Sequence, residues 1–233
     1  MRADRVASAL LLVLLSICDY ARAEVTGFAS VMSDYRYRGV SLSGMKPALQ
    51  AGINFDHASG LYAGAAVSNV DLDRDAKGLG ALIYGGYAHP IGTRASWDAG
   101  VVTYVYPSPQ RGPDYNYTEA HVGVSLERVN ARVYYSDDYY GTGVSTAYAE
   151  INVAQPVGER VTLLAHVGYI RYLETYNWRG PAGHTDFKAG INVDVGARFN
   201  VELSVTAIDN TEHCISGRNH CGTAAVFSLS RTF

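Results

Sequence analysis

The sequence lacks the features that define several large classes of protein. After residue 23 no apolar run approaches the roughly 18 residues that a transmembrane helix needs, which excludes helical membrane spanning. Residues 24–233 carry 16 basic and 20 acidic side chains, so no positive excess favours nucleic acid as a partner. No phosphate-binding glycine loop, nucleotide fingerprint or zinc-protease helix motif occurs, and no cofactor is implied.

Residues 1–23 have the pattern of a cleaved secretory signal. A basic start and a short apolar core lead to an A-x-A cleavage site, Ala21-Arg22-Ala23. Cys18 would be acylated in a lipoprotein, but isoleucine stands directly before it, where such sites need a small residue. We therefore expect an exported chain that forms a single domain over residues 24–233.

The exported part is rich in short segments that alternate between apolar and polar positions. Leu49, Ala51, Ile53 and Phe55 share one face of such a segment, and Gln50, Gly52, Asn54 and Asp56 share the other. The segments at 119–127 and 187–196 alternate in the same way. A secreted β-sandwich would also alternate, but it would need large aliphatic side chains on its inner faces. Here the second face is glycine, serine, asparagine and acidic residues, which favours a barrel that spans a membrane.

Twelve strands are expected, with ten or fourteen as alternatives. They lie at about 25–40, 47–57, 61–70, 79–89, 96–106, 117–127, 131–136, 146–155, 161–172, 185–196, 201–209 and 223–233. Connections after the even-numbered strands are short and several of the others are long, as in outer-membrane barrels whose short turns are periplasmic. The sequence predicts an all-β, transmembrane, up-and-down antiparallel β-barrel in the outer membrane of a Gram-negative bacterium.

The end of the chain supports this prediction. Counting back from Phe233 in steps of two gives Arg231, Leu229, Phe227 and Ala225 on one face, and a terminal aromatic after alternating hydrophobes resembles the last strand that the barrel-assembly machinery recognises. Arg231 departs from that pattern, and we expect it to extend toward the periplasmic membrane interface. Outer-membrane lipid and the assembly machinery are thus the expected partners of the barrel.

Charge and aromatic residues alternate most closely in Ser33-Asp34-Tyr35-Arg36-Tyr37-Arg38-Gly39. As part of a first strand at 25–40, this stretch would place its two tyrosines at the lipid interface and its three charged side chains in the lumen.

The same stretch carries a family resemblance. Together with Pro47-Ala48-Leu49-Gln50-Ala51-Gly52, Ser59-Gly60-Leu61-Tyr62-Ala63-Gly64 and Ser68-Asn69-Val70, it resembles the TorF-type porins, a Gram-negative family long known only as conserved hypothetical proteins. The match covers roughly residues 25–90. The resemblance implies an outer-membrane barrel of porin type and supplies neither a substrate nor a set of functional residues.

Charged side chains on the inward faces are the candidates for lining a pore. They are Asp34, Arg36, Arg38, Asp98, Glu119, His121, Glu150, Lys188, Asp194 and Glu202. Arg36 and Arg38 are expected toward the outer end, level with Glu119 and Lys188, with further acidic groups toward the periplasm. Either the two arginines face carboxylates across an open pore and select small charged or polar solutes, or they form salt bridges that hold the lumen closed.

Cys214 and Cys221 are the only cysteines after the signal, in the doublets His213-Cys214 and His220-Cys221. Export to an oxidising compartment favours a disulfide between them. A metal site made of both histidines and both thiolates is the alternative, although export argues against it.

Tyrosines concentrate near the expected outer ends of the strands. An aromatic girdle at the lipid interface is the preferred interpretation of Tyr104, Tyr106, Tyr115, Tyr117, Tyr134, Tyr135, Tyr139, Tyr140, Tyr169, Tyr172 and Tyr176, with Trp178. Some of them, such as Tyr104 and Tyr134, fall on inward positions instead, where stacked aromatics could guide sugars.

The predicted function is that of a porin-like channel for passive diffusion of small hydrophilic solutes. A closed barrel with a structural or surface-interaction role is the alternative. An outer-membrane acyl hydrolase is disfavoured, because His121 and Ser125 share a face but lie about 13 Å apart along a strand. We therefore expect no enzymatic activity.

Overall fold

The computed structural model describes residues 23–73, 76–107, 114–174, 183–209 and 221–233. These residues form fourteen β-strands and one short 3-10 helix. The elements are β1 (Ala23–Met32), β2 (Arg36–Tyr37), β3 (Val40–Ser41), β4 (Ala48–His57), β5 (Leu61–Asp73), β6 (Ala76–Ile91), β7 (Ala95–Val105), β8 (Tyr117–Leu126), β9 (Val129–Ser136), η1 (Tyr139–Gly141), β10 (Thr146–Val157), β11 (Val161–Tyr172), β12 (Gly183–Gly196), β13 (Phe199–Ile208) and β14 (Ala224–Thr232).

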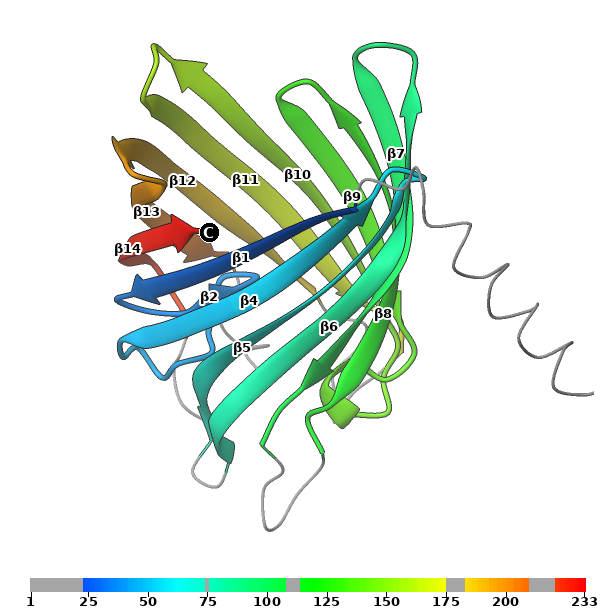
Figure 1. The fold of residues 1–233 in the computed structure, drawn as a ribbon. Helices are drawn as coiled ribbons and strands as arrows, with labels where there is room; N and C mark the ends of the chain where they lie inside the picture. The colour runs from blue at the N-terminus through cyan, green and yellow to red at the C-terminus, as the bar shows by residue number, and fades with distance from the viewer. Residues whose placement is uncertain (1–22, 74–75, 108–113, 175–182, 210–220) are drawn as a thin grey trace, which may run out of the picture.

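Twelve of these strands close into one antiparallel barrel (Figure 1). Each strand from β4 to β14 pairs with its neighbour in sequence, and β1 closes the ring by pairing with both β4 and β14. The predicted fold class and strand number are therefore confirmed. Among the described residues, no helix is long and apolar enough to span a membrane.

The two faces of the wall differ as the alternation predicts. Leu49, Ile53 and Phe55 point outward and are 67%, 53% and 41% exposed. On the inward face, Glu119 and Tyr148 are each only 1% exposed. Because water cannot satisfy backbone groups within a bilayer, a closed ring of paired strands with an apolar outer face is a stable way for β-structure to span it.

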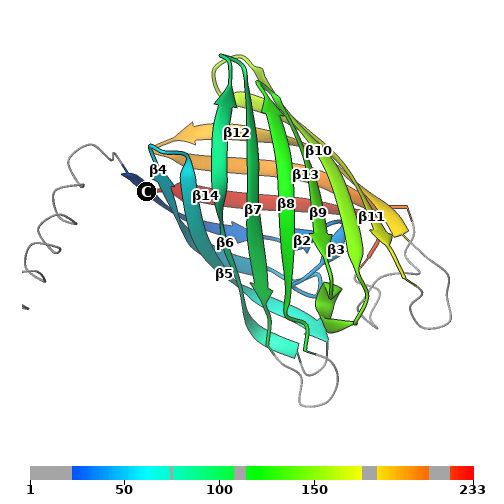
Figure 2. The same cartoon turned by 90° about the vertical axis from the view of Figure 1, so that its right-hand side faces the viewer.

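Tight turns join β4 to β5, β6 to β7, β8 to β9, β10 to β11 and β12 to β13 at one end of the barrel, which we call the short-turn end (Figures 1 and 2). The opposite end is the long-loop end. The start of β1 and the C-terminus both lie at the short-turn end, where the backbone N–H of Phe233 donates to the carbonyl oxygen of Gly27 at 2.9 Å. The guanidinium of Arg231 lies 5.0 Å from the ring centroids of both Phe199 and Phe233.

The prediction of one strand over 25–40 is wrong beyond Met32. The chain leaves the wall there, and residues 33–47 form an inner hairpin in which β2 and β3 pair as a separate two-stranded sheet. Arg38 and Gly39 both adopt positive φ at its turn, with values of 50° and 77°. A strand cannot accommodate two successive left-handed residues, so the alternation of charge and tyrosine in this stretch belongs to the hairpin.

Candidate channel constriction

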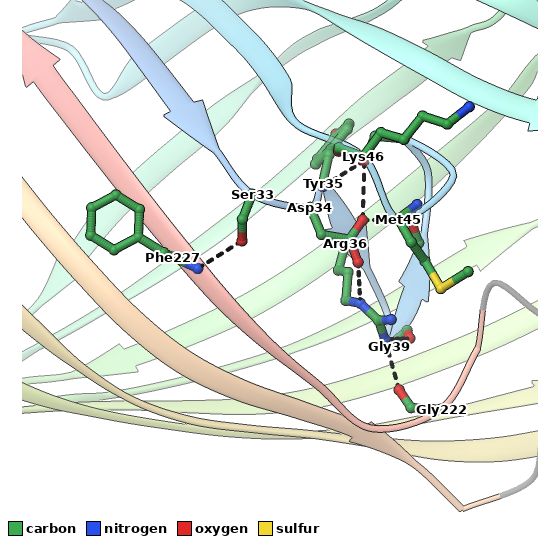
Figure 3. Close-up of polar contacts among 11 residues, drawn as sticks. Ser33, Asp34, Tyr35, Arg36, Gly39, Met45, Lys46, Gly222 and Phe227 are labelled. Atoms are coloured by element: carbon green, nitrogen blue, oxygen red, sulfur yellow. Dashed lines mark hydrogen bonds and ion pairs between the residues drawn. The ribbon is translucent and has the colours of Figure 1, made fainter.

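The inner hairpin, residues 33–47, is tied to the barrel wall where it begins. The backbone N–H of Ser33 donates to the carbonyl oxygen of Phe227 at 2.8 Å, and the N–H of Phe227 donates to Oγ of Ser33 at 3.0 Å (Figure 3). These bonds extend the pairing of β1 with β14 by one residue before the chain turns inward. The hairpin is thereby fixed to the seam at which the barrel closes.

Asp34 organises the inside of the hairpin. Its carboxylate accepts hydrogen bonds from Oγ of Ser41 at 2.5 Å and Oγ of Ser43 at 3.0 Å, and it pairs with Nε of Arg36 at 2.7 Å. The Arg36 guanidinium also donates to the carbonyl oxygens of Gly39 and Gly222, at 3.0 and 2.7 Å (Figure 3). Hydrogen bonds to a charged group are among the stronger ones, so this carboxylate fixes the side chains of Ser41, Ser43 and Arg36. The two serine hydroxyls in turn accept the backbone N–H groups of Met45 and Tyr35, at 2.8 and 2.9 Å.

Arg38, at the turn of the hairpin, crosses to β8 and pairs with Glu119. Two parallel bonds of 2.8 Å join its terminal nitrogens to the two carboxylate oxygens. The side chains are 3% and 1% exposed, so the pair is dry. A bidentate pair of this kind is specific in geometry, and breaking it by removing one partner would leave a buried charge uncompensated.

Four tyrosine rings surround the same guanidinium. Its central carbon lies 3.8 Å from the ring centroid of Tyr148, and 4.7, 5.2 and 5.8 Å from those of Tyr37, Tyr134 and Tyr139. Burial by itself would lower the pKa of Arg38, but the neighbouring acidic groups of Tyr37 and Glu119 outweigh it, and the pKa lies well above its usual range. Burial raises the pKa of Tyr139 to about 12. The centre of the lumen therefore holds a permanent cation against neutral phenol rings and one carboxylate.

Tyrosines fill the lumen around this centre. Tyr104 stacks on Tyr117 with ring centroids 4.5 Å apart, and Tyr117 contacts Tyr140 at 4.7 Å. The hydroxyl of Tyr37 hydrogen bonds to that of Tyr104 at 2.7 Å. The buried core of the described structure thus lies inside the barrel, toward the long-loop end.

The predicted aromatic girdle is wrong for most of its members. Seven of the tyrosines belong to the buried cluster or pack against it from inside: Tyr104, Tyr106, Tyr117, Tyr134, Tyr139, Tyr140 and Tyr172. Tyr115 also packs against this cluster. Tyr135 and Tyr169 are 48% and 49% exposed on the outer face, and Tyr176 and Trp178 lie outside the described residues. Tyr35 and Tyr37, expected as lipid anchors, likewise pack against the cluster, because the inner hairpin carries them into the lumen.

Two histidine–aspartate pairs line the wall of the barrel. Asp98 contacts Nε2 of His121 at 3.1 Å and Nε of Arg132 at 3.3 Å. Asp186 contacts Nε2 of His166 at 2.8 Å and accepts from the hydroxyl of Tyr148 at 3.1 Å. Both carboxylates are buried, at 6% and 2% exposure, so these partners take the place of water.

The remaining candidates extend toward the short-turn end. Nζ of Lys188 pairs with Glu202 at 2.6 Å, and these side chains are 36% and 21% exposed. Glu150 accepts from the hydroxyl of Tyr134 at 3.2 Å, and Asp194 accepts from the N–H of Gly196 at 2.8 Å. Lys188 therefore forms its ion pair on the short-turn side of the constriction. The expectation that it lies level with Arg38 is wrong.

Arg132, Tyr148 and Asp186 are the residues that sequence reasoning missed. Arg132 shares a face with Tyr134, and Asp186 shares one with Lys188, so strand periodicity could have found both. His121, weighed earlier as a hydrolase residue, is held by Asp98 and by the hydroxyl of Tyr62 at 3.1 Å. Its Nε2 is thus engaged with these groups in the wall.

Among the described residues, no group of three or more histidine, cysteine and acidic side chains could hold a metal ion. Cys214 lies outside those residues, so the Cys214–Cys221 disulfide stays a prediction. The cleaved signal also lies outside them.

The closed barrel, with an apolar outer face and charged, polar and tyrosine side chains within, has the architecture typical of outer-membrane β-barrels. Residues 20–233 match the family Gcw_chp, described as a bacterial protein of unknown function, and the chain belongs to this family. The TorF-type name is not confirmed by the comparisons. No curated protein matches the chain.

Solved porins share this fold. A structure of the NanC porin is similar with a TM-score of 0.58 and 10% identity, covering 90% of this chain and 99% of that one. The KdgM porin is similar with a TM-score of 0.55 and 9% identity, over the same shares of the two chains. The KdgM porin in complex with disordered oligogalacturonate is similar with a TM-score of 0.57 and 9% identity, covering 90% of this chain and 99% of that one. At such identities the likeness shows the fold alone.

Proposed function

We propose that the protein is an outer-membrane, porin-like channel for small hydrophilic solutes, with the inner hairpin as its constriction. The observation that carries the proposal is the folding of residues 33–47 into a closed barrel whose inward face is charged and polar. The similar porins, one of them in complex with oligogalacturonate, support passage of small solutes. The proposal includes export through residues 1–23, insertion by the barrel-assembly machinery and a periplasmic short-turn end.

The test is conductance of the refolded full chain in planar lipid bilayers. We expect discrete channels from the unaltered chain. We expect a larger unit conductance for the double variant Arg38→Ala, Glu119→Ala, because it removes both side chains from the constriction and so leaves neither charge buried without its partner. The matched control is Arg94→Ala, Glu127→Ala, which removes an ion pair of 3.4 Å whose side chains are 78% and 54% exposed at a short turn. The control is expected to conduct as the unaltered chain does.

A closed barrel with a structural or surface-interaction role is the second candidate. The 3% and 1% exposure of the Arg38 and Glu119 side chains favours it, since this pair is buried inside the barrel. Silent bilayers with the unaltered chain, together with currents from the double variant, would support the closed barrel. Silence from both proteins would reject the channel altogether.

A further inference from the structure

The surroundings of Arg38 have the chemistry of a cation-binding site. Glu119 supplies both carboxylate oxygens at 2.8 Å, and four tyrosine rings face the guanidinium within 5.8 Å. A carboxylate combined with aromatic faces is the combination that proteins use to hold guanidinium and ammonium groups. The occupant in this structure is a side chain of the protein itself.

The site and its occupant come from different parts of the fold. Glu119, Tyr134 and Tyr148 stand on β8, β9 and β10 of the barrel wall, whereas Arg38 stands on the inner hairpin. Any displacement of the hairpin would therefore remove the cation and leave most of its site in place. A solute that carries a similar cation could then fill the same position on its way through.

The charge of the lumen favours such a solute. The described lumen, including the hairpin, presents eight carboxylates, on Asp34, Asp56, Asp98, Glu119, Glu150, Asp186, Asp194 and Glu202. Apart from Lys46 of the hairpin, which pairs with Asp71 of β5 at 3.0 Å, it presents four permanent cations, on Arg36, Arg38, Arg132 and Lys188. Each of these four forms an ion pair with one of the eight carboxylates.

Four carboxylates consequently have no lysine or arginine partner among the described residues. They belong to Asp56, Glu150, Asp186 and Asp194. Fixed charges of one sign in a narrow passage with low-dielectric walls concentrate ions of the opposite sign and repel those of the same sign. The passage on the short-turn side of the constriction is thus acidic.

We propose that the channel selects small organic cations bearing a guanidinium or primary ammonium group, and that Glu119 with Tyr134 and Tyr148 forms their binding site at the constriction. This rests on the proposed channel function. The excess of carboxylates draws cations into the lumen, and the tyrosine-lined carboxylate holds them where Arg38 otherwise lies.

Reversal potentials across a potassium chloride gradient test the selectivity. We expect the channel to be about tenfold more permeable to potassium than to chloride. With methylguanidinium chloride and potassium methanesulfonate in place of potassium chloride, we expect methylguanidinium to carry more current than methanesulfonate. The double variant Asp56→Asn, Asp194→Asn is expected to lose most of the preference without altering the constriction, because neither side chain contacts Arg38, Glu119 or the tyrosines around them. The matched control, Glu127→Gln, Glu159→Gln, removes two acidic groups from short turns and is expected to retain it. Preference for chloride would overturn the proposal while leaving the channel intact.

A binding measurement keeps the proposal testable if no current appears. The Arg38→Ala protein in detergent presents the site without its occupant, and titration with methylguanidinium is expected to change its tyrosine fluorescence at least tenfold more effectively than titration with methanesulfonate. Binding without conductance would reject the channel and support the cation site. Equal responses to the two ions, or a response that persists in Arg38→Ala, Glu119→Ala, would overturn the site.

Discussion

The two halves of the lumen hold the same kind of ion pair in opposite environments. Toward the long-loop end, Arg38 and Glu119 are 3% and 1% exposed and packed among tyrosines. Toward the short-turn end, Lys188 and Glu202 lie 2.6 Å apart but are 36% and 21% exposed. Because the ladder of strand pairing satisfies the backbone of the wall, the inward side chains are free to form a dry core in one half and a wet surface in the other. In the proposed channel, the dry half would control whether solutes pass and the wet half would select their charge.

The largest loss of unfolding free energy is expected for Glu119→Ala, in the dry half. It leaves the buried guanidinium of Arg38 without its carboxylate, which costs about 3–5 kcal/mol of unfolding free energy. Urea unfolding of the refolded barrel in detergent would measure this loss. The double variant Arg38→Ala, Glu119→Ala should recover part of it, and a single variant as stable as the unaltered chain would show that the pair is not desolvated.

A smaller loss is expected for Ser41→Ala, inside the hairpin. The Ser41 hydroxyl donates to the Asp34 carboxylate at 2.5 Å, and its removal should cost about 1.5–3 kcal/mol, the range for hydrogen bonds to charged groups. The control is Ser59→Ala at an exposed short turn. Its hydroxyl is hydrogen-bonded to His57, and its removal should change the unfolding free energy by less than about 0.5 kcal/mol. Equal effects on urea unfolding would mean that Asp34 does not organise the hairpin.

The turn of the hairpin can be tested with a matched pair of glycines. Gly39 has φ of 77°, and a Cβ there would lie 3.1 Å from Cβ of Asp186, whereas Gly143 has φ of 70° and open space around it. Gly143→Ala should cost about 1–2 kcal/mol through backbone strain alone. Gly39→Ala should cost more than this and should also change the channel conductance. Equal losses would indicate that the tip of the hairpin does not press against β12.

The strands of the wall could be predicted from sequence because each has one apolar and one polar face. That rule places Leu49 outside and Glu119 inside without knowledge of any contact. It fails for Tyr35 and Tyr37, because a charged and aromatic alternation suits both a wall strand and a hairpin in the lumen. The deciding property is the left-handed backbone at Arg38 and Gly39, and arginine gives no sign of it in the sequence.

The tyrosines were harder to place for a related reason. A tyrosine is stable at a lipid interface, with its ring in lipid and its hydroxyl in water, and equally stable in a lumen that other tyrosines fill. The inward register of Tyr104 and Tyr134 favours the lumen, and the structure places both there. The pairing of Arg38 with Glu119 depends on residues 81 positions apart, and no local pattern specifies such a contact.

The smallest effect on stability is expected for Lys188→Gln in the wet half. Water screens its pair with Glu202, so the loss of unfolding free energy should stay below about 1 kcal/mol. Removing one partner of the dry pair should cost several times more, because the other charge is left buried. The change should nevertheless be visible in the current, because removing one of the four lumen cations leaves Glu202 as a further uncompensated carboxylate and raises the preference for potassium over chloride. Reversal potentials and urea unfolding of the same variant separate the two effects. A loss as large as that of Glu119→Ala would show that the two halves of the lumen are equally dry and that the comparison between them fails.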